Sequence, residues 1–194
     1  MRRRPTLARG AGSLHYTVGV RVKGTVEVPL WELKSGVFVL HIYVDADACP
    51  VKEETYRVAT RYGIPVTLVA GSWMRIPSRP QLTLEVVDQE FDAADDWIVA
   101  HVGKGDVVIT SDIPLASRCI ERGAQVLSPT GRPFTASNIG DALATRNLLS
   151  ELRGAGLDSS GPPPFDSRDR SRFLQALDQA IQAMRRLPSG PADT

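Results

Sequence analysis

The sequence predicts an α/β fold, a three-layer sandwich whose parallel sheet carries helices on both faces. Five short apolar segments alternate with helical patterns between residues 37 and 127. Strands and helices that alternate in this way form right-handed crossovers, and therefore a parallel sheet. Glycine and proline at the expected positions mark the ends of the helices. We expect the strand order 3-2-1-4-5, which places the first and fourth strands side by side.

The first predicted strand, residues 37–44, runs directly into two carboxylates. It is an unbroken apolar and β-branched run with His41 as its one polar member, which is typical of a strand buried on both faces. Asp45 and Asp47 follow it. Ligands of open α/β sheets bind beyond the carboxyl ends of the strands, so both acids stand where chemistry would occur. Capping of the next helix is the alternative role for Asp45.

The other elements follow in order along the chain. Pro50 suits the first turn of a helix that Gly63 ends. Further strands are predicted at residues 64–70, 82–87, 106–110 and 124–127, and helices at 51–62, 92–102, 113–122, 137–153 and 169–186. Residues 71–80 form a long loop, on which Trp73 is predicted either to stack a nucleobase, with Arg75 and Arg79 on phosphate, or to pack in the core.

Four regions are predicted along the chain. Residues 1–36 form a basic extension with seven basic and two acidic side chains, interpreted as a mis-assigned start, a disordered appendage or an arm that helps to hold nucleic acid. The α/β domain occupies residues 37–153, and a linker rich in Gly and Pro occupies 154–168. A C-terminal amphipathic helix, 169–187, is expected to pack on the domain. Its apolar stripe comprises Phe173, Leu174, Leu177, Ile181 and Met184.

Composition excludes several classes of protein. No apolar run approaches the roughly 20 residues of a membrane span, and the N-terminus lacks the apolar core of a signal peptide. We therefore expect a cytoplasmic protein with no membrane partner. Cys49 and Cys119 are widely separated and are expected to be reduced thiols. Outside the extension the chain is mildly acidic, which argues against a broad basic surface for nucleic acid.

Carboxylates gather in three segments of the chain. They are Asp45 and Asp47 after the first strand, Asp92, Asp95 and Asp96 at the start of a helix, and Asp112 after the fourth strand. Stabilisation of the helix dipole is the alternative for the middle group. Oxygen donors in this number suit Mg²⁺ or Mn²⁺, and we predict all six as metal ligands. The expected reaction is phosphodiester hydrolysis with Asp45, Asp96 and Asp112 as the catalytic set.

Polar residues near the same strand ends are candidate substrate contacts. Lys52 follows the first acids, Ser111 precedes Asp112, and Arg132 and Asn138 follow the fifth strand. A phosphate contact is the functional prediction for Lys52, and plain exposure is the alternative. Turn or cap roles are equally good for Arg132 and Asn138. The expected partner is single-stranded or structured RNA.

Several motifs resemble those of the YaiI/YqxD family of bacterial proteins. They are Val-Asp-Ala-Asp-Ala-Cys-Pro-Val-Lys at 44–52, Ala-Ala-Asp-Asp-Trp-Ile at 93–98, the segment 105–116, Asn-Ile at 138–139 and Asp-Arg-Ser-Arg-Phe at 169–173. The resemblance covers about residues 39–187. This family is similar in its acidic pattern to PIN-like nucleases, so the resemblance implies a PIN-like sheet with clustered acids. Fold alone does not establish activity.

Two alternatives to a nuclease stay open. The Asp45-Ala-Asp47 pattern also fits haloacid-dehalogenase-like phosphatases, in which the first Asp is the nucleophile and the second the general acid. That chemistry requires an acidic pair after a later strand, whereas Asp95 and Asp96 fall on a predicted helix and Asp106 begins a strand. The other alternative is a PIN-like module that binds nucleic acid without cleaving it.

Overall fold

The computed structural model describes residues 40–47, 49–88, 92–155 and 164–186. They all belong to one compact unit, Phe38–Pro188. The described strands are β1 (Ile42–Asp45), β2 (Val66–Ala70), β3 (Leu82–Val86), β4 (Val107–Ile109), β5 (Gln125–Leu127) and β6 (Pro133–Phe134). The described helices are α2 (Lys52–Tyr62), α3 (Ala93–His101), α4 (Ile113–Glu121), α5 (Ile139–Gly154) and α6 (Ser167–Arg186). The predicted extension, 1–36, lies outside the described residues.

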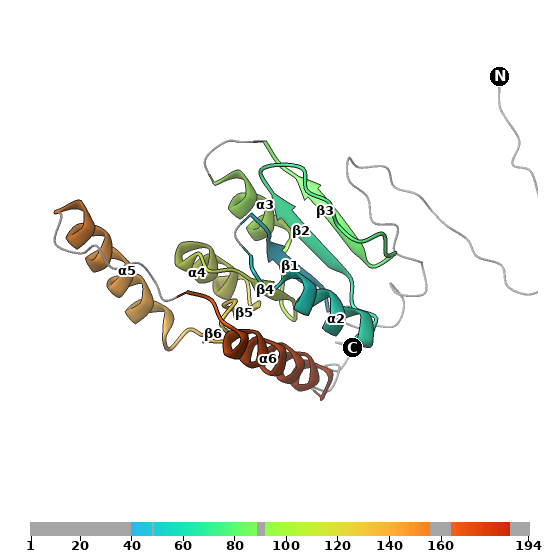
Figure 1. Ribbon diagram of the computed structural model, residues 1–194. Helices are drawn as coiled ribbons and strands as arrows, with labels where there is room; N and C mark the ends of the chain where they lie inside the picture. The colour runs from blue at the N-terminus through green and yellow to red at the C-terminus, as the bar shows by residue number, and fades with distance from the viewer. Residues whose placement is uncertain (1–39, 48, 89–91, 156–163, 187–194) are drawn as a thin grey trace, which may run out of the picture. The chain divides into compact units, whose positions relative to one another are not determined.

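The six strands form one sheet in the order β3-β2-β1-β4-β5-β6 (Figure 1). Strands β1 to β5 are parallel, and β6 pairs antiparallel with β5. The predicted order of the first five strands is therefore confirmed, within a mostly parallel α/β sheet. The chain proceeds from β1 toward one edge and returns to β4 on the other side of β1. This reversal makes the carboxyl ends of β1 and β4 the topological switch point, where open sheets bind ligands.

Most element boundaries differ from the predictions by one to three residues, and three differences are informative. β1 begins at Ile42, while residues 37–39 lie outside the described part, and Asp45 is the last residue of the strand instead of the first one after it. Helix α2 has Val51 as its N-cap, so Pro50 lies in the turn before the helix. β6 was not predicted, because two residues are too few to show a periodic pattern.

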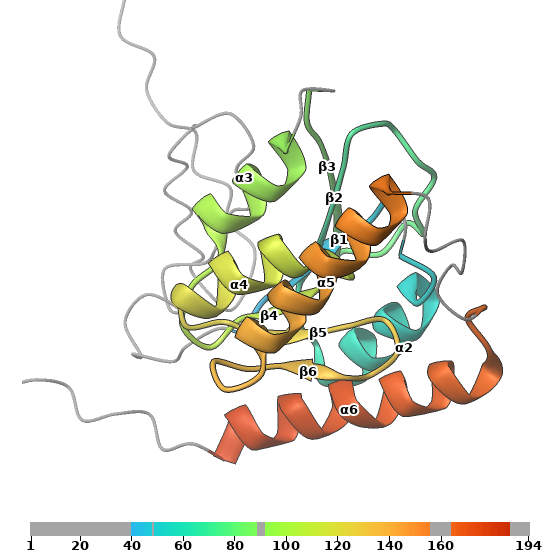
Figure 2. The same cartoon turned by 90° about the vertical axis from the view of Figure 1, so that its left-hand side faces the viewer.

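Apolar side chains pack on both faces of the sheet. Ile42 and Val44 point to one face and Tyr43 to the other, as the two-residue period of a strand requires. Helices α2 and α6 cover the first face, and α3 and α4 cover the second (Figure 2). The helices on both faces that the sequence predicted are therefore present, and the ends of β1 and β4 lie between two packed layers.

Helix α6 covers its face of the sheet with a regular apolar stripe. Phe173, Leu177 and Ile181, each four residues apart, are fully buried, and Leu174 and Met184 are partly buried beside them. The helix packs on α2 and on β5. It starts at Ser167, two residues before the predicted start. None of the helices in the described ranges is long and apolar enough to cross a membrane.

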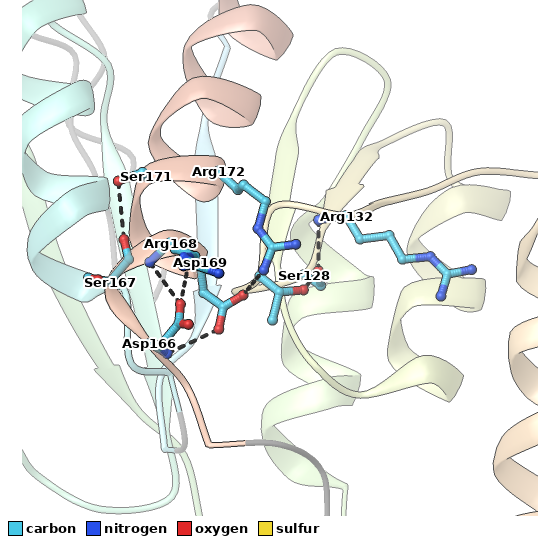
Figure 3. A network of polar contacts seen from close by, with 9 residues as sticks. Ser128, Arg132, Asp166, Ser167, Arg168, Asp169, Ser171 and Arg172 are labelled. Carbon is cyan, nitrogen blue, oxygen red and sulfur yellow. Dashed lines mark hydrogen bonds and ion pairs between the residues drawn. The ribbon is translucent and has the colours of Figure 1, made fainter.

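Acidic side chains cap the start of α6 (Figure 3). Asp166 Oδ1 accepts hydrogen bonds from the backbone N of Arg168 at 2.7 Å and of Asp169 at 2.9 Å. Asp169 Oδ2 accepts from the backbone N of Asp166 at 3.0 Å, and Oδ1 pairs with Arg172. These bonds satisfy amide groups that a helix start otherwise leaves without partners. Backbone amides therefore stabilise the negative charge of both carboxylates, and Arg172 adds to this for Asp169.

Gly131 allows the β5–β6 turn to approach the backbone of α6. Its φ is 80°, which favours glycine, and a Cβ built there would lie 2.7 Å from both the carbonyl carbon of Arg172 and the backbone N of Phe173. Ser128 holds the same turn, because its Oγ accepts a hydrogen bond from the backbone N of Arg132 at 3.0 Å. The C-terminal helix is thus tied to the loop after β5.

Candidate functional site at the ends of β1 and β4

Asp45 and Asp112 come from neighbouring strands of the sheet. β1 pairs with β4 in the register Val44↔Ile109, so Asp45 lies beside the segment that leads from β4 into α4. Asp112 is the N-cap of α4, and its Oδ1 accepts a hydrogen bond from the backbone N of Leu115 at 2.8 Å. Asp112 therefore caps the N-terminus of α4 through Oδ1. Its second oxygen, Oδ2, accepts no hydrogen bond from the described residues.

Thr110 connects the two acids, and sequence reasoning did not identify it. Its Oγ1 donates to Asp45 Oδ2 at 2.8 Å and accepts from the backbone N of Asp112 at 2.9 Å. The residue is 1% exposed. A hydroxyl at the end of an otherwise apolar buried strand was the available signal, because a buried polar group needs partners. Thr110 fixes the orientation of Asp45 relative to the start of α4.

Asp95 is the member of the α3 acids that faces this site. Burial and the charges of Asp112, Asp45 and Asp92 raise its pKa to about 6, while Arg118 opposes the shift. Burial is the largest cause of this shift, and the further contributions of Asp112 and Asp45 require that these carboxylates lie within electrostatic range of Asp95. The structure therefore brings Asp95 together with acids that are 50 residues before it and 17 residues after it in the chain.

Asp92 and Asp96 do not share a helix face, although they are four residues apart in the chain. Asp92 is the N-cap of α3 with φ 62°, so it lies outside the helix, and the four-residue rule does not apply to it. The Asp96 side chain is 67% exposed and accepts a hydrogen bond from Arg118 Nη2 at 2.5 Å. Asp95, instead of Asp96, thus points toward the other acids, and the predicted catalytic role of Asp96 has no support from these contacts.

Asp47 and Lys52 organise the loop between β1 and α2. Asp47 is exposed, and its Oδ2 accepts a hydrogen bond from the backbone N of Gly71 at 3.0 Å, which ties this loop to the one after β2. Lys52 Nζ donates to the carbonyl oxygen of Ala46 at 2.7 Å. Lys52 therefore lies close enough to Asp45 to oppose the rise in its pKa.

Burial is the main influence on the charge of Asp45. It raises the pKa of this carboxyl, as do the charges of Asp47 and Asp112, whereas the Thr110 hydroxyl and Lys52 lower it. Asp45 Oδ1 accepts no hydrogen bond from the described residues. In those residues, no three His, Cys, Asp or Glu side chains are placed closely enough to hold a metal ion by themselves. The acids converge, but they do not form a complete coordination shell.

Of the other predicted substrate contacts, Ser111 and Arg132 lie near the carboxyl ends of β4 and β5, whereas Asn138 follows β6, which returns antiparallel toward the amino end of β5. Ser111 is exposed beside Asp112, and Arg132 is exposed on the β5–β6 turn, with its guanidinium extended away from Asp169 (Figure 3). Asn138 stabilises the turn before α5, since its Oδ1 accepts from the backbone N of Thr135 at 2.9 Å and its Nδ2 donates to the carbonyl oxygen of Pro133 at 3.0 Å. The turn role is the one that Asn138 has in this structure.

The cysteines and His41 have structural surroundings. Cys49 and Cys119 are buried free thiols, and burial raises their pKa to about 11 and about 12. Thiols of this kind are poor nucleophiles at neutral pH. His41 stacks on Tyr43 and makes a 2.9 Å contact with Thr67 Oγ1, while burial lowers its pKa to about 4. Cys49 and Cys119 thus belong to the hydrophobic core and are free thiols, as predicted, and His41 is partly buried beside Tyr43.

A cavity of about 290 Å³ lies away from the acids, between α4, β5 and β6. Its walls are mainly apolar, and among the described residues they include none of the predicted site residues. The lining comprises Ile120, Ala124, Gln125, Val126, Leu127, Pro133, Phe134, Thr135 and Ala136. Perturbed carboxylates at a switch point are a better guide to chemistry than this cavity.

Comparison with known proteins establishes the family. Residues 43–183 match the family model described as "Uncharacterized BCR, YaiI/YqxD family". The chain belongs to the YaiI/YqxD family. A relative named "UPF0178 protein" from Rhodopseudomonas palustris (strain BisB18) is 55% identical over 145 residues, which cover 75% of this chain and 94% of the relative. A protein of the same name from Nitrobacter winogradskyi (strain Nb-255) is 54% identical over 147 residues, covering 76% of this chain and 94% of that protein.

The YaiI/YqxD match contains every predicted site residue, from Asp45 to Asn138. It also contains Asp169 to Phe173, the motif with which α6 meets the β5–β6 turn. No solved structure matches the chain. The family assignment predicted from the motifs is thus confirmed, whereas the names of the relatives identify no reaction.

Proposed function

We propose that this member of the YaiI/YqxD family is a metal-dependent nuclease of the PIN-like type that hydrolyses phosphodiester bonds in RNA. The observation that supports the proposal is the convergence of Asp45, Asp95 and Asp112 at the switch point. These side chains come from β1, α3 and the start of α4, and the charge of Asp112 adds to burial in raising the pKa of both Asp45 and Asp95. A cation between them would relieve this repulsion, and so would bring a phosphate group to an acidic surface.

The donor set suits Mg²⁺ or Mn²⁺. All three groups are carboxylates, and hard cations of this kind prefer oxygen. Mg²⁺ commonly binds proteins through one or two carboxylates and fills its remaining positions with water and substrate phosphate. The lack of three preassembled ligands in the described residues is therefore compatible with this chemistry. Asp45 and Asp112, each with one oxygen free of hydrogen bonds from those residues, are the proposed principal ligands.

The protein's own groups would have distinct tasks in this reaction. A bound divalent cation would lower the pKa of a water molecule and neutralise charge on the leaving oxygen. Thr110 keeps Asp45 in one orientation through a 2.8 Å hydrogen bond. Asp95, with a pKa of about 6, exchanges its proton near neutral pH and is the proposed general base or acid. Lys52 and Arg132 are proposed contacts of substrate phosphate.

The direct test is cleavage of single-stranded RNA and DNA oligonucleotides during titration with Mg²⁺ or Mn²⁺. We expect activity that EDTA abolishes and that falls about 100-fold or more in the Asp45→Asn/Asp112→Asn double variant. Asparagine is also a good N-cap, so the double variant retains the start of α4. The matched control is Asp178→Asn, which removes a carboxylate that contacts Arg61 and Tyr62 at the other end of α2. Cleavage that survives in the double variant would contradict the proposed site.

One further variant and two further measurements separate the roles that remain open. Asp96→Asn tests the catalytic role predicted from the sequence, and its exposed ion pair with Arg118 leads us to expect little loss of activity. Covalent trapping of a phosphate analogue on Asp45 would support the phosphatase alternative instead. Tight RNA binding without cleavage under any metal would favour the module that only binds.

A further inference from the structure

The loop that follows β2 holds a tryptophan in solvent beside the acidic site. Trp73 is 75% exposed, although tryptophan side chains are highly buried on average. Single exposed apolar residues are common on protein surfaces, so exposure alone indicates little. The way in which this loop is fixed, and its position, are the informative features.

Both ends of the loop are anchored by hydrogen bonds. At its start the backbone N of Gly71 donates to Asp47 Oδ2 at 3.0 Å. At its end Arg79 Nη1 donates to Thr60 Oγ1 at 3.1 Å, and Gln81 Nε2 donates to the same oxygen at 2.9 Å. Arg79 is therefore hydrogen-bonded to α2. Arg75 remains as the candidate for the phosphate contact that the sequence suggested for both arginines.

Side chains alternate between core and solvent in the middle of the loop. Met74 and Ile76 are partly buried and pack on the core shared with α2 and α6, while Trp73 and Arg75 are exposed. Because Met74 and Ile76 pack inward, the indole of Trp73 and the guanidinium of Arg75 on either side of Met74 are both left in solvent. Trp73 is thus held outward by its packed neighbours, which lowers the entropic cost of placing a ligand on it.

The position of the loop connects it to the acids. β1 and β2 are neighbouring parallel strands in the register Asp45↔Val69, and Ala46 N donates to Val69 O at 2.9 Å. Trp73 follows Gly71, the residue bonded to Asp47, by two positions, a span of at most about 7 Å. The indole of Trp73 and the guanidinium of Arg75 therefore lie beside the proposed metal site. An aromatic face next to a positive side chain is the combination that binds single-stranded nucleic acid.

We infer that Trp73 and Arg75 form a subsite for single-stranded nucleic acid, in which an unpaired base stacks on the Trp73 indole and Arg75 contacts the adjacent phosphate. This inference rests on the proposed nuclease function, because it names the form of the substrate at the same site. A base within a duplex has both faces covered by its neighbours, so it cannot stack on the indole. The subsite therefore selects single strands by shape and stacking instead of by sequence.

The test is binding of a fluorescent single-stranded RNA, measured by anisotropy in EDTA and again in Mg²⁺, with the integrity of the RNA checked on a gel. We expect Trp73→Ala to weaken binding about 10-fold or more, and Trp73→Phe, which keeps an aromatic face, to weaken it less than about 3-fold. A blunt 24-base-pair RNA duplex should bind the two variants and the wild type equally. Leu148→Ala removes another exposed apolar side chain, on α5, and is the matched control.

A second measurement reports on the indole and the guanidinium directly. Saturating single-stranded RNA should quench tryptophan emission in the wild type, and this quenching should be largely lost in Trp73→Phe. Arg75→Gln should reduce the slope of log K against log[salt] by about 0.7, the value for one phosphate contact in single strands. Arg186→Gln, at the far end of α6, is the charge control and should leave the slope unchanged.

The outcomes separate this inference from the proposed nuclease function. Binding to single strands that depends on Trp73, without cleavage under any metal, would support the subsite and overturn the nuclease. Metal-dependent cleavage with unchanged single-strand affinity in Trp73→Ala would overturn the subsite and leave the nuclease standing. Equal losses for single strands and duplex would also overturn the subsite. Unchanged RNA affinity in Trp73→Ala and Trp73→Phe, together with weaker binding of a protein partner by these variants, would assign the Trp73 side chain to a protein interface instead.

Discussion

The carboxylates at the start of α6 and those at the ends of β1 and β4 have opposite surroundings. Asp166 and Asp169 accept hydrogen bonds from helix amides, and Asp169 also pairs with Arg172 (Figure 3). Asp45 and Asp95 have raised pKa values, to which burial and neighbouring carboxylates contribute. The first group has the surroundings of structural acids. Burial and repulsion in the second group, Asp45 and Asp95, destabilise the folded protein. Such destabilising groups are common at binding and catalytic sites.

Helix α6 also joins two loops near the carboxyl edge of the sheet. Arg170 Nη1 donates to the carbonyl oxygen of Pro50 at 3.2 Å and to Glu54 Oε1 at 3.0 Å. Gly131 places the β5–β6 turn against the same helix. Asp166 and Asp169 thus have hydrogen-bond and ion-pair partners, whereas Asp45 and Asp95 lie near other carboxylates. Variants in the two groups should therefore change stability in opposite directions.

The largest expected effect is that of Gly131→Ala. The added Cβ would meet the backbone of α6 at 2.7 Å, and the φ of 80° is strained for alanine. Because neither the backbone of the β5–β6 turn nor that of α6 can move without loss of packing, we expect a decrease of about 3 kcal/mol or more in the free energy of unfolding, measured by urea denaturation. Gly140→Ala, on α5, has no atom within 4 Å of its new Cβ and is the control. A loss of similar size at both positions would contradict the close packing of the turn on α6.

The next effect concerns the buried carboxylate that Arg170 compensates. The Glu54 side chain is 6% exposed, and its Oε2 has no hydrogen-bond partner among the described residues. Arg170→Met should destabilise the protein by about 2 kcal/mol, less than for a fully buried pair because Arg170 is half exposed. The double variant Glu54→Met/Arg170→Met should recover most of this loss in urea denaturation. Additive losses in the double variant would show that the two side chains do not act as a pair.

Asp169→Asn and Asp95→Asn should change stability with opposite signs. Asp169→Asn weakens the cap and the ion pair of α6 and should cost about 1 kcal/mol. Asp95 binds its proton more tightly in the folded state, with a pKa of about 6 against an ordinary 3.8, so its contribution to stability falls as pH rises through this interval. Asp95→Asn should therefore stabilise the protein by about 1 kcal/mol at pH 7, allowing for solvent screening, and by almost nothing below pH 4.

Thermal unfolding of both variants at pH 4, 5, 6 and 7 would measure this difference. A pH-independent effect of Asp95→Asn would mean that neither burial nor the charges of Asp112 and Asp45 raise the pKa of Asp95. Addition of Mg²⁺ should raise the unfolding temperature of the wild type more than that of Asp95→Asn, if a cation relieves the repulsion.

The smallest expected effect is that of Thr110→Val. The hydroxyl lowers the pKa of Asp45 by donating to it, so its removal should raise that pKa further and shift the midpoint of metal binding to higher pH. Calorimetric titration with Mn²⁺ between pH 5 and 8 would measure the shift. Thr110→Ser keeps the donor and should restore the wild-type midpoint. A profile that is the same for all three proteins would exclude Thr110 from the control of Asp45.

Much of the fold could be predicted because its signals are local. The buried strand that ends at Asp45, the left-handed Gly63 after α2 and the apolar stripe of α6 each follow from residues close in sequence. The short β6 could not be predicted, because its pairing with β5 depends on a turn and on contacts with α6.

The candidate site was predictable in its acids but not in their arrangement. Asp45 and Asp112 follow from strand ends. The choice between Asp95 and Asp96 depends on where α3 begins, and the left-handed backbone of Asp92 moves that start by one residue. Thr110 could not be assigned because its role consists of two contacts across neighbouring strands.

The covering of one sheet face by α6 has a consequence for synthesis of the protein. The strands from β1 to β6 are complete by Phe134, but Phe173, Leu177 and Ile181 fill their shared core only when the last helix has been made. A nascent chain on the ribosome therefore exposes the part of this sheet face that α2 leaves uncovered until α6 emerges. Such surfaces attract chaperones and promote aggregation. Premature termination before Ser167 should thus yield a chain that is removed by proteolysis instead of a smaller folded domain.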